Sequence, residues 1–83
     1  MSKIIMGIQL DQRRETAKEV QDLLTKYGCF IKTRLGVHQA SSDSCSEQGL
    51  IILEFIDRAD KEVYEMEKSL SGINNVVVKK MEF

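Results

Sequence analysis

One feature restricts the fold of this chain more than any other: the same order of sequence patterns occurs twice. Each half has an alternating apolar segment, then an amphipathic segment, a glycine and another apolar segment. In the first half, residues 4–10 alternate with the period of two that is typical of a strand. The alternating apolar residues are Ile4, Met6, Ile8 and Leu10.

A helix is predicted between Asp11 and Gly28. The Asp11 carboxylate can accept hydrogen bonds from the backbone N–H groups of a first helical turn, as N-cap residues do. Four apolar residues behind it have helical spacing and form one stripe, which we expect to face the core. They are Ala17, Val20, Leu24 and Tyr27. Gly28 is then expected to end the helix with a positive φ, and residues 29–37 to form the second strand.

The second half repeats this order. Residues 50–56 are predicted to be a strand, and Asp57 or Asp60 to cap a second helix. The apolar stripe of that helix is Ala59, Val63, Met66 and Leu70. Gly72 is expected to end the helix as Gly28 ends the first, and residues 73–83 to carry the last strand.

Strand–helix–strand written twice is the split βαβ pattern. We therefore predict an α+β fold of the ferredoxin-like type, βαββαβ, in which a four-stranded antiparallel sheet carries two helices on one face. The chain has 83 residues and no proline, so residues 1–83 are expected to form a single domain.

Two helices can cover only one face of such a sheet. Residues 50–53 and 76–78 are nonetheless apolar at every position, whereas a sheet with one solvated face alternates apolar with polar residues. Because an exposed apolar face invites association, we expect the second face to be buried in a homo-oligomer, a dimer or a tetramer. The alternative is a monomer whose strands tolerate these apolar residues.

The composition argues against two classes of partner. Twelve Lys and Arg stand against 13 Asp and Glu, a net charge of −1, and this balance disfavours nucleic acid because phosphate neutralisation needs clustered cations. No apolar run approaches the ~18–20 residues that span a bilayer, and no signal-peptide pattern follows Met1, so we expect a cytoplasmic protein without a membrane partner. Cys29 and Cys45 are then expected to be free thiols, with Cys29 a small core residue.

Residues 36–49 are predicted to be a polar loop that exceeds the two to five residues a hairpin needs. Because binding residues are commonly found on such loops, we place the candidate ligand-binding site here, close to the seam between subunits. Its residues are Gly36, His38, Ser41, Asp43, Cys45 and Glu47.

Within this loop, His38 and Cys45 are good ligands for a borderline metal ion. A two-fold axis could bring two loops together as a His₂Cys₂ set, so a metal- or redox-responsive protein is the alternative function; a flexible serine-rich loop is the simpler interpretation. We do not predict an enzyme. No base stands beside Cys45, and the sequence has no P-loop, G-x-G-x-x-G or nucleophile elbow. No cofactor is assigned.

Several segments resemble a known family. They are residues 8–11, 32–38, 45–54 and 72–81, so the resemblance extends over nearly the whole chain, from its first predicted strand to its last. They are similar to the small proteins called iron-only hydrogenase system regulators, which are related in fold to ACT domains and to the C-terminal sensor domain of the nickel-responsive repressor. The resemblance implies a βαββαβ subunit that assembles into dimers or tetramers and senses a small ligand.

The sequence departs from both relatives. The turn over residues 10–15 lacks the glycine with which ACT domains bind amino acids. Gly36 stands where the nickel sensor has its first His, and His38 is the only histidine. The chain begins directly at its first strand, so no DNA-binding segment is expected. The leading hypothesis is a stand-alone, oligomeric ligand-sensing or regulatory domain that acts by binding a small molecule or a protein.

Overall fold

The computed structural model describes the backbone of residues 3–11, 14–40 and 45–83, and the side chains of residues 3–10, 15–36 and 49–83. Four strands, two α-helices and one 3₁₀ turn occur in this part of the chain. In chain order they are β1 (Ile4–Asp11), α1 (Arg14–Lys26), the 3₁₀ turn Gly28–Phe30, β2 (Ile31–Ala40), β3 (Cys45–Phe55), α2 (Asp60–Ser71) and β4 (Val76–Glu82).

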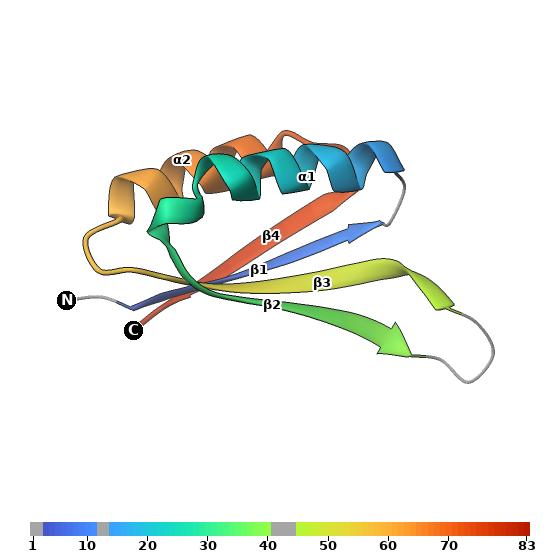
Figure 1. Ribbon diagram of the computed structural model, residues 1–83, viewed down its shortest axis with the longest axis horizontal. Coiled ribbons are helices and arrows are strands. Elements are labelled where there is room, and N and C mark those ends of the chain that lie inside the picture. The colour runs from blue at the N-terminus through green and yellow to red at the C-terminus, as the bar shows by residue number, and fades with distance from the viewer. Residues whose placement is uncertain (1–2, 12–13, 41–44) are drawn as a thin grey trace.

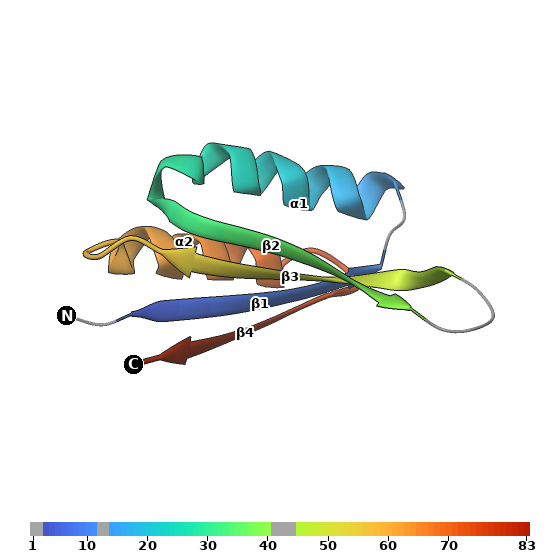
Figure 2. The same cartoon turned by 60° about the horizontal axis from the view of Figure 1, so that its bottom comes forward.

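The sheet is antiparallel throughout and has the strand order β2-β3-β1-β4. Both helices lie on the same side of it (Figure 1). Turning the molecule brings the strands in front of the helices, with α2 partly hidden behind β2 and β3 and α1 above β2, so the broad side of the sheet without helices comes toward the viewer (Figure 2). The predicted α+β ferredoxin-like fold, with four antiparallel strands and two helices on one face, is confirmed.

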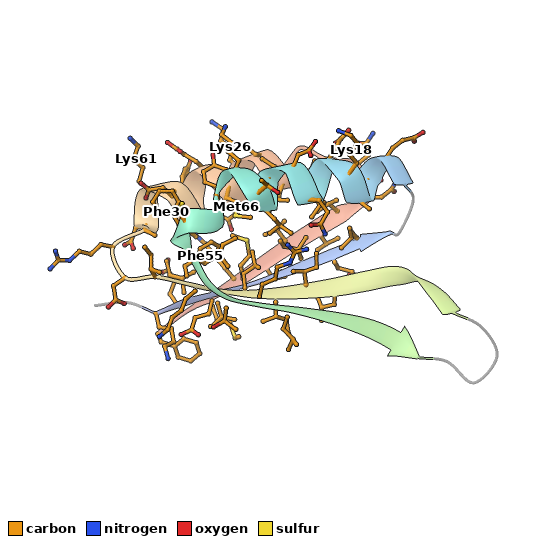
Figure 3. All side chains as sticks on the ribbon, in the orientation of Figure 1. Lys18, Lys26, Phe30, Phe55, Lys61 and Met66 are labelled. Carbon is orange, nitrogen blue, oxygen red and sulfur yellow. The ribbon has the colours of Figure 1, made fainter. Side chains whose placement is uncertain are left out.

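The core lies between the helices and the sheet. The alternating residues of β1 and the stripes of both helices form it, as their spacing predicted, and each large apolar side chain that is fully buried contributes about 1.5–3 kcal/mol over an exposed one. The seven largest fully buried side chains are Met6, Ile8, Val20, Leu53, Val63, Met66 and Leu70. In Figure 3, Met66 and Phe55 lie between helix and sheet, whereas Lys18, Lys26 and Lys61 point away from it.

The helix ends differ from the sequence prediction. Neither Gly28 nor Gly72 adopts a positive φ, and Gly72 ends α2 at φ −81°. The N-cap of α2 is Ala59, without a side-chain cap, so the prediction of Asp57 or Asp60 is wrong. Ala59 is buried at 2% exposure, so core packing decides where this helix begins. Asp60 and Glu62 instead lie in its first turn, where their charges favour the helix dipole.

The start of β2 also differs from the prediction. Cys29 lies in the 3₁₀ turn and is exposed, so it is not a core residue. An irregularity between Ile31 and Thr33 then changes the face of the strand: Ile31 pairs with buried Phe55, whereas Thr33 pairs with Glu54 on the opposite face. A bulge of this kind adds one residue to a strand, which a regular alternation from Cys29 onward cannot reveal.

The prediction of a long polar loop over residues 36–49 is wrong. β2 continues to Ala40 and β3 begins at Cys45, so most of this segment is a two-stranded hairpin. Pairing satisfies the backbone groups of polar residues as well as apolar ones, so the ladder continues where the apolar alternation stops. Figure 1 shows the hairpin extending past the helices at one end of the molecule.

The sheet face away from the helices is here called the open face. Among the residues whose side chains are described, the register places seven apolar or glycine residues on it, which are Ile5, Gly7, Leu35, Leu50, Ile52, Val77 and Met81. Four of these are substantially exposed: Leu35 (54%), Leu50 (37%), Val77 (49%) and Met81 (57%). Both faces of β3 are therefore apolar, as predicted, and no element in the described ranges covers the second one.

Candidate functional site

The six residues predicted to bind a ligand all belong to the β2–β3 hairpin or its connection. Gly36 lies in β2, is exposed, and has no atom within 4 Å of the place where a Cβ would be. In the backbone register, His38 pairs with Gly49 and Cys45 with Ala40. These two pairs are separated by two positions on β2 and four on β3, with an irregularity of the ladder between them, so His38 and Cys45 belong to the same end of the hairpin.

The side chains of that hairpin end lie outside the described residues. This applies to His38, Cys45 and Glu47, and to Ser41 and Asp43 in their entirety. Among the side chains that the structure describes, no group of three His, Cys, Asp or Glu could hold a metal ion. The ligand-binding set and the metal pair therefore stay predictions.

A polar hollow of about 360 Å³ lies beside α1. Residues from the first turns of that helix and from the connection between α2 and β4 line it. They are Glu15, Thr16, Glu19, Gly72, Ile73, Asn74 and Asn75. Its size lies at the small end of the range for ligand pockets. Figure 1 places the start of α1 and the end of α2 toward the end of the molecule where the hairpin projects.

Charge decides what this hollow can accept. Glu15 and Glu19 are one helical turn apart on α1 and both are exposed, and the described lining contains no Lys or Arg. Carboxylates repel anions at any distance that solvent does not screen. The lining therefore suits a cationic or a neutral polar molecule better than a phosphate.

Sequence reasoning did not identify this hollow. One signal was present, the pair Asn74-Asn75 directly before the valine run. Asn75 has a φ of 67°, in the left-handed region that asparagine tolerates better than most residues. The turn that Asn75 makes places the α2–β4 connection next to α1, and an Asn-Asn pair before a strand is a recognisable mark of such a turn.

The polar side chains of the open face are partly paired. Glu54 contacts Lys3 (N···O 3.5 Å) and accepts a hydrogen bond from Thr33 Oγ1 (3.2 Å). Arg34, on the helix side, donates to Gln21 of α1 (2.7 Å) and ties β2 to that helix. Lys79 stands on the open face beside Gly7. The interior of the open face is thus apolar except for Gln9, which lies between Leu50 and Val77, and its charges lie toward one end and one edge.

No helix in the described part of the chain is long and apolar enough to cross a membrane.

The strand order and the placement of the helices define the class of this protein, a ferredoxin-like α+β domain. Solved structures of the same fold span the whole chain. An uncharacterized protein of Thermotoga maritima, TM1266, superimposes with a TM-score of 0.75 at 19% identity, covering 100% of this chain and 99% of its own.

Two further solved structures have the same architecture. CPII, a nitrogen regulatory PII-like protein from Thiomonas intermedia K12 solved with ADP, AMP and bicarbonate, has a TM-score of 0.64 at 16% identity and covers 100% of this chain and 91% of its own. A dimeric ferredoxin-like protein from an uncultured marine organism has a TM-score of 0.51 at 8% identity, with coverages of 99% and 92%. At these identities the likeness establishes the fold. No family model and no curated protein matches the sequence.

Proposed function

We propose that this chain is a small ligand-sensing regulatory domain that works as a homo-oligomer and acts by binding rather than by catalysis. The observation that carries the proposal is that the polar hollow beside α1 and the projecting β2–β3 hairpin lie toward the same end of the molecule. The occurrence of this fold in a nitrogen regulatory PII-like protein supports a regulatory role.

The chemistry of the ligand follows from the hollow. Two carboxylates, a hydroxyl and two amide side chains offer hydrogen-bond acceptors and donors to a small polar molecule. We expect a ligand with an amino or guanidinium group, held between Glu15 and Glu19. The PII-like neighbour was solved with anions, so nucleotides and bicarbonate are the natural competitors to test.

The experiment is a thermal-shift titration of the purified protein with putrescine, arginine, ADP, AMP and bicarbonate. A ligand at 100 times its dissociation constant stabilises the folded state by about 2.7 kcal/mol. For a domain of this size such a gain raises Tm by roughly 10–20 °C. The variant Glu19→Gln should reduce the shift caused by a cation, whereas Glu65→Gln, an exposed glutamate on α2, serves as the matched control.

Two outcomes would contradict the proposal. If no compound in the panel or in a wider metabolite screen shifts Tm, ligand sensing is refuted. If ADP or AMP shifts Tm and the cations do not, the ligand binds elsewhere, and the assignment of the hollow fails.

A metal- or redox-responsive function is the second candidate. It is supported by the placement of His38 and Cys45 on opposite strands at the same end of the hairpin, and imidazole with thiolate suits a borderline metal ion. Elemental analysis of untagged protein and zinc titration test it. Zinc affinity that is unchanged in the double variant His38→Ala, Cys45→Ser would refute it.

The narrower role in regulating an iron-only hydrogenase system rests on the resemblance over residues 32–38, 45–54 and 72–81. Deletion of the gene from an organism that carries it, followed by measurement of hydrogenase activity and complementation, tests that role. Activity that is unaltered by the deletion would refute it.

A further inference from the structure

The centre of the open face has one position without a side chain. Gly7 lies in the middle of β1, a central strand, and pairs with Ile52 on one side and with Lys79 on the other. A glycine inside a strand lowers its stability, and it commonly marks a place where another molecule approaches the backbone closely. Nothing in the described part of the chain requires the glycine, because a Cβ there would lie 3.9 Å from Leu50 Cδ1 and 4.0 Å from the Lys79 carbonyl oxygen, both ordinary contacts.

The chain exposes more surface to solvent than a typical monomer of its mass. The chain exposes 5968 Å², whereas a monomer of 9.5 kDa typically exposes about 5,050 Å². The excess of about 900 Å² is close to the ~800 Å² that each partner buries in a standard interface. The open face and the projecting hairpin are the two parts that the helices leave uncovered (Figure 2).

The composition of the open face suits a second copy of the same chain. Its interior is apolar except for Gln9, Lys3 is paired with Glu54 within the chain, and Lys79 stands on the edge strand β4, from which its ammonium can reach water. An apolar centre with charges at the rim is the usual anatomy of an interface. Because this face carries so little net charge, it has no electrostatic complementarity to a highly charged partner. Two such faces can meet across a two-fold axis without charge repulsion.

We propose that two copies associate through their open faces, sheet against sheet, and that Gly7 of each copy leaves the space into which an apolar side chain of the other packs. This contact would form the homo-oligomer of the proposed regulatory domain. Its role in regulation rests on the proposed function. Sheets that pack face to face are about 10 Å apart with interdigitated side chains, so a missing side chain in one layer requires a large one in the other.

The test compares substitutions on the open face with matched ones elsewhere. Gly7→Leu fills the space, and Gly28→Leu places the same side chain on an exposed glycine that has nothing within 4 Å. Leu35→Lys and Tyr64→Lys form a second pair, since Leu35 is 54% and Tyr64 55% exposed, the first on the open face and the second on α2. Circular dichroism verifies that each variant is folded, and sedimentation equilibrium measures its association.

We expect the unmodified chain to be a dimer, or a tetramer of such dimers, at about 100 µM and to be mostly dissociated at about 1 µM. Because an overpacked contact occurs twice across a two-fold axis, Gly7→Leu should raise the dimer dissociation constant by about 100-fold or more. Leu35→Lys should do the same, and Gly28→Leu and Tyr64→Lys should leave the constant unchanged.

Three results would overturn the inference. A chain that is monomeric at 100 µM (on the order of the weakest useful self-association) excludes the contact. Dissociation by Tyr64→Lys and not by Leu35→Lys moves the interface to α2. Dissociation by Leu35→Lys with Gly7→Leu unaffected refutes the packing at Gly7. None of these results depends on a ligand, so ligand sensing and the dimer contact can fail separately.

Discussion

Truncation of Leu35 should cost different amounts of stability in the separate chain and in the dimer. Full burial of a leucine side chain is worth about 1.5–3 kcal/mol, and in one copy slightly less than half of Leu35 is covered, because 54% of it is exposed. Leu35→Ala should therefore lower the free energy of unfolding of the separate chain by about 1 kcal/mol. In the dimer the covered fraction approaches completeness, and the loss should rise to about 2–3 kcal/mol per chain.

Urea denaturation at two protein concentrations measures this difference. At about 1 µM, below the expected association range, the variant and the parent chain should differ by the smaller amount, and at about 100 µM by the larger. The control is Tyr64→Ala, whose side chain is 55% exposed on α2; its loss should be the same at both concentrations. If Leu35→Ala also loses the same free energy at both concentrations, no second copy covers the open face, and the reasoning from its apolar residues is refuted.

Three further substitutions test the fold itself. Leu53→Ala, at a side chain with 0% exposure, should cost about 2–5 kcal/mol and lower Tm by more than 10 °C in calorimetry. Asn75→Val should cost about 1–2 kcal/mol, because a β-branched residue is strained at a φ of 67°, whereas Asn75→Gly should be tolerated; chemical denaturation distinguishes them. Glu67→Gln breaks the 3.2 Å ion pair with Lys80 and should cost less than about 1 kcal/mol, an effect that 1 M salt removes.

Each of these has a contradicting result. A loss below about 1 kcal/mol for Leu53→Ala would mean that the helix side of β3 is not packed as described. Equal stability of the Asn75→Val and Asn75→Gly proteins would contradict the left-handed turn before β4. A large, salt-independent loss in Glu67→Gln would show that its contact with Lys80 is more deeply buried than its 30% side-chain exposure indicates.

The fold could be predicted because its determinants are local and repeated. The alternation of β1 and the stripe over Val63, Met66 and Leu70 predict which side chains are buried, and the structure buries them. Burial of this kind depends on spacing alone. Likewise, the apolar residues at every position of 50–53 predicted that the second face of the sheet is also apolar, and the register places Leu50 and Ile52 on it. The burial of that face against another copy stays a prediction.

The errors have a shared physical cause, which is that they depend on partners distant in the sequence. Whether Ala59 or Asp60 begins α2 depends on the core that Ala59 enters. The bulge after Ile31 and the length of the hairpin depend on how β3 pairs with β2. A period of two shows that a strand exists, but it does not give the length of its ladder.

The location of the hollow could not be predicted from the sequence. The predicted ligand-binding set lies on the hairpin and stays a prediction, whereas the lining of the hollow comes from α1 and from the α2–β4 connection, 53 positions or more apart (Glu19 to Gly72) in the chain. No local pattern links Glu19 with Asn74. From the sequence alone, Gly7 is only a residue that disfavours a strand. The strand register shows in addition that its neighbours on both sides carry larger side chains.

The two ends of the described chain are adjacent, since the Phe83 backbone N–H donates to the Lys3 carbonyl oxygen at 2.8 Å. They lie at the opposite end of the long axis from the hairpin (Figure 1). An affinity tag, a fluorophore or a fused domain attached at either end is therefore held well away from the hollow. The attached group lies beside the last residue pair of the sheet instead. A bulky C-terminal fusion should therefore hinder self-association more than it hinders the access of a small molecule to the hollow.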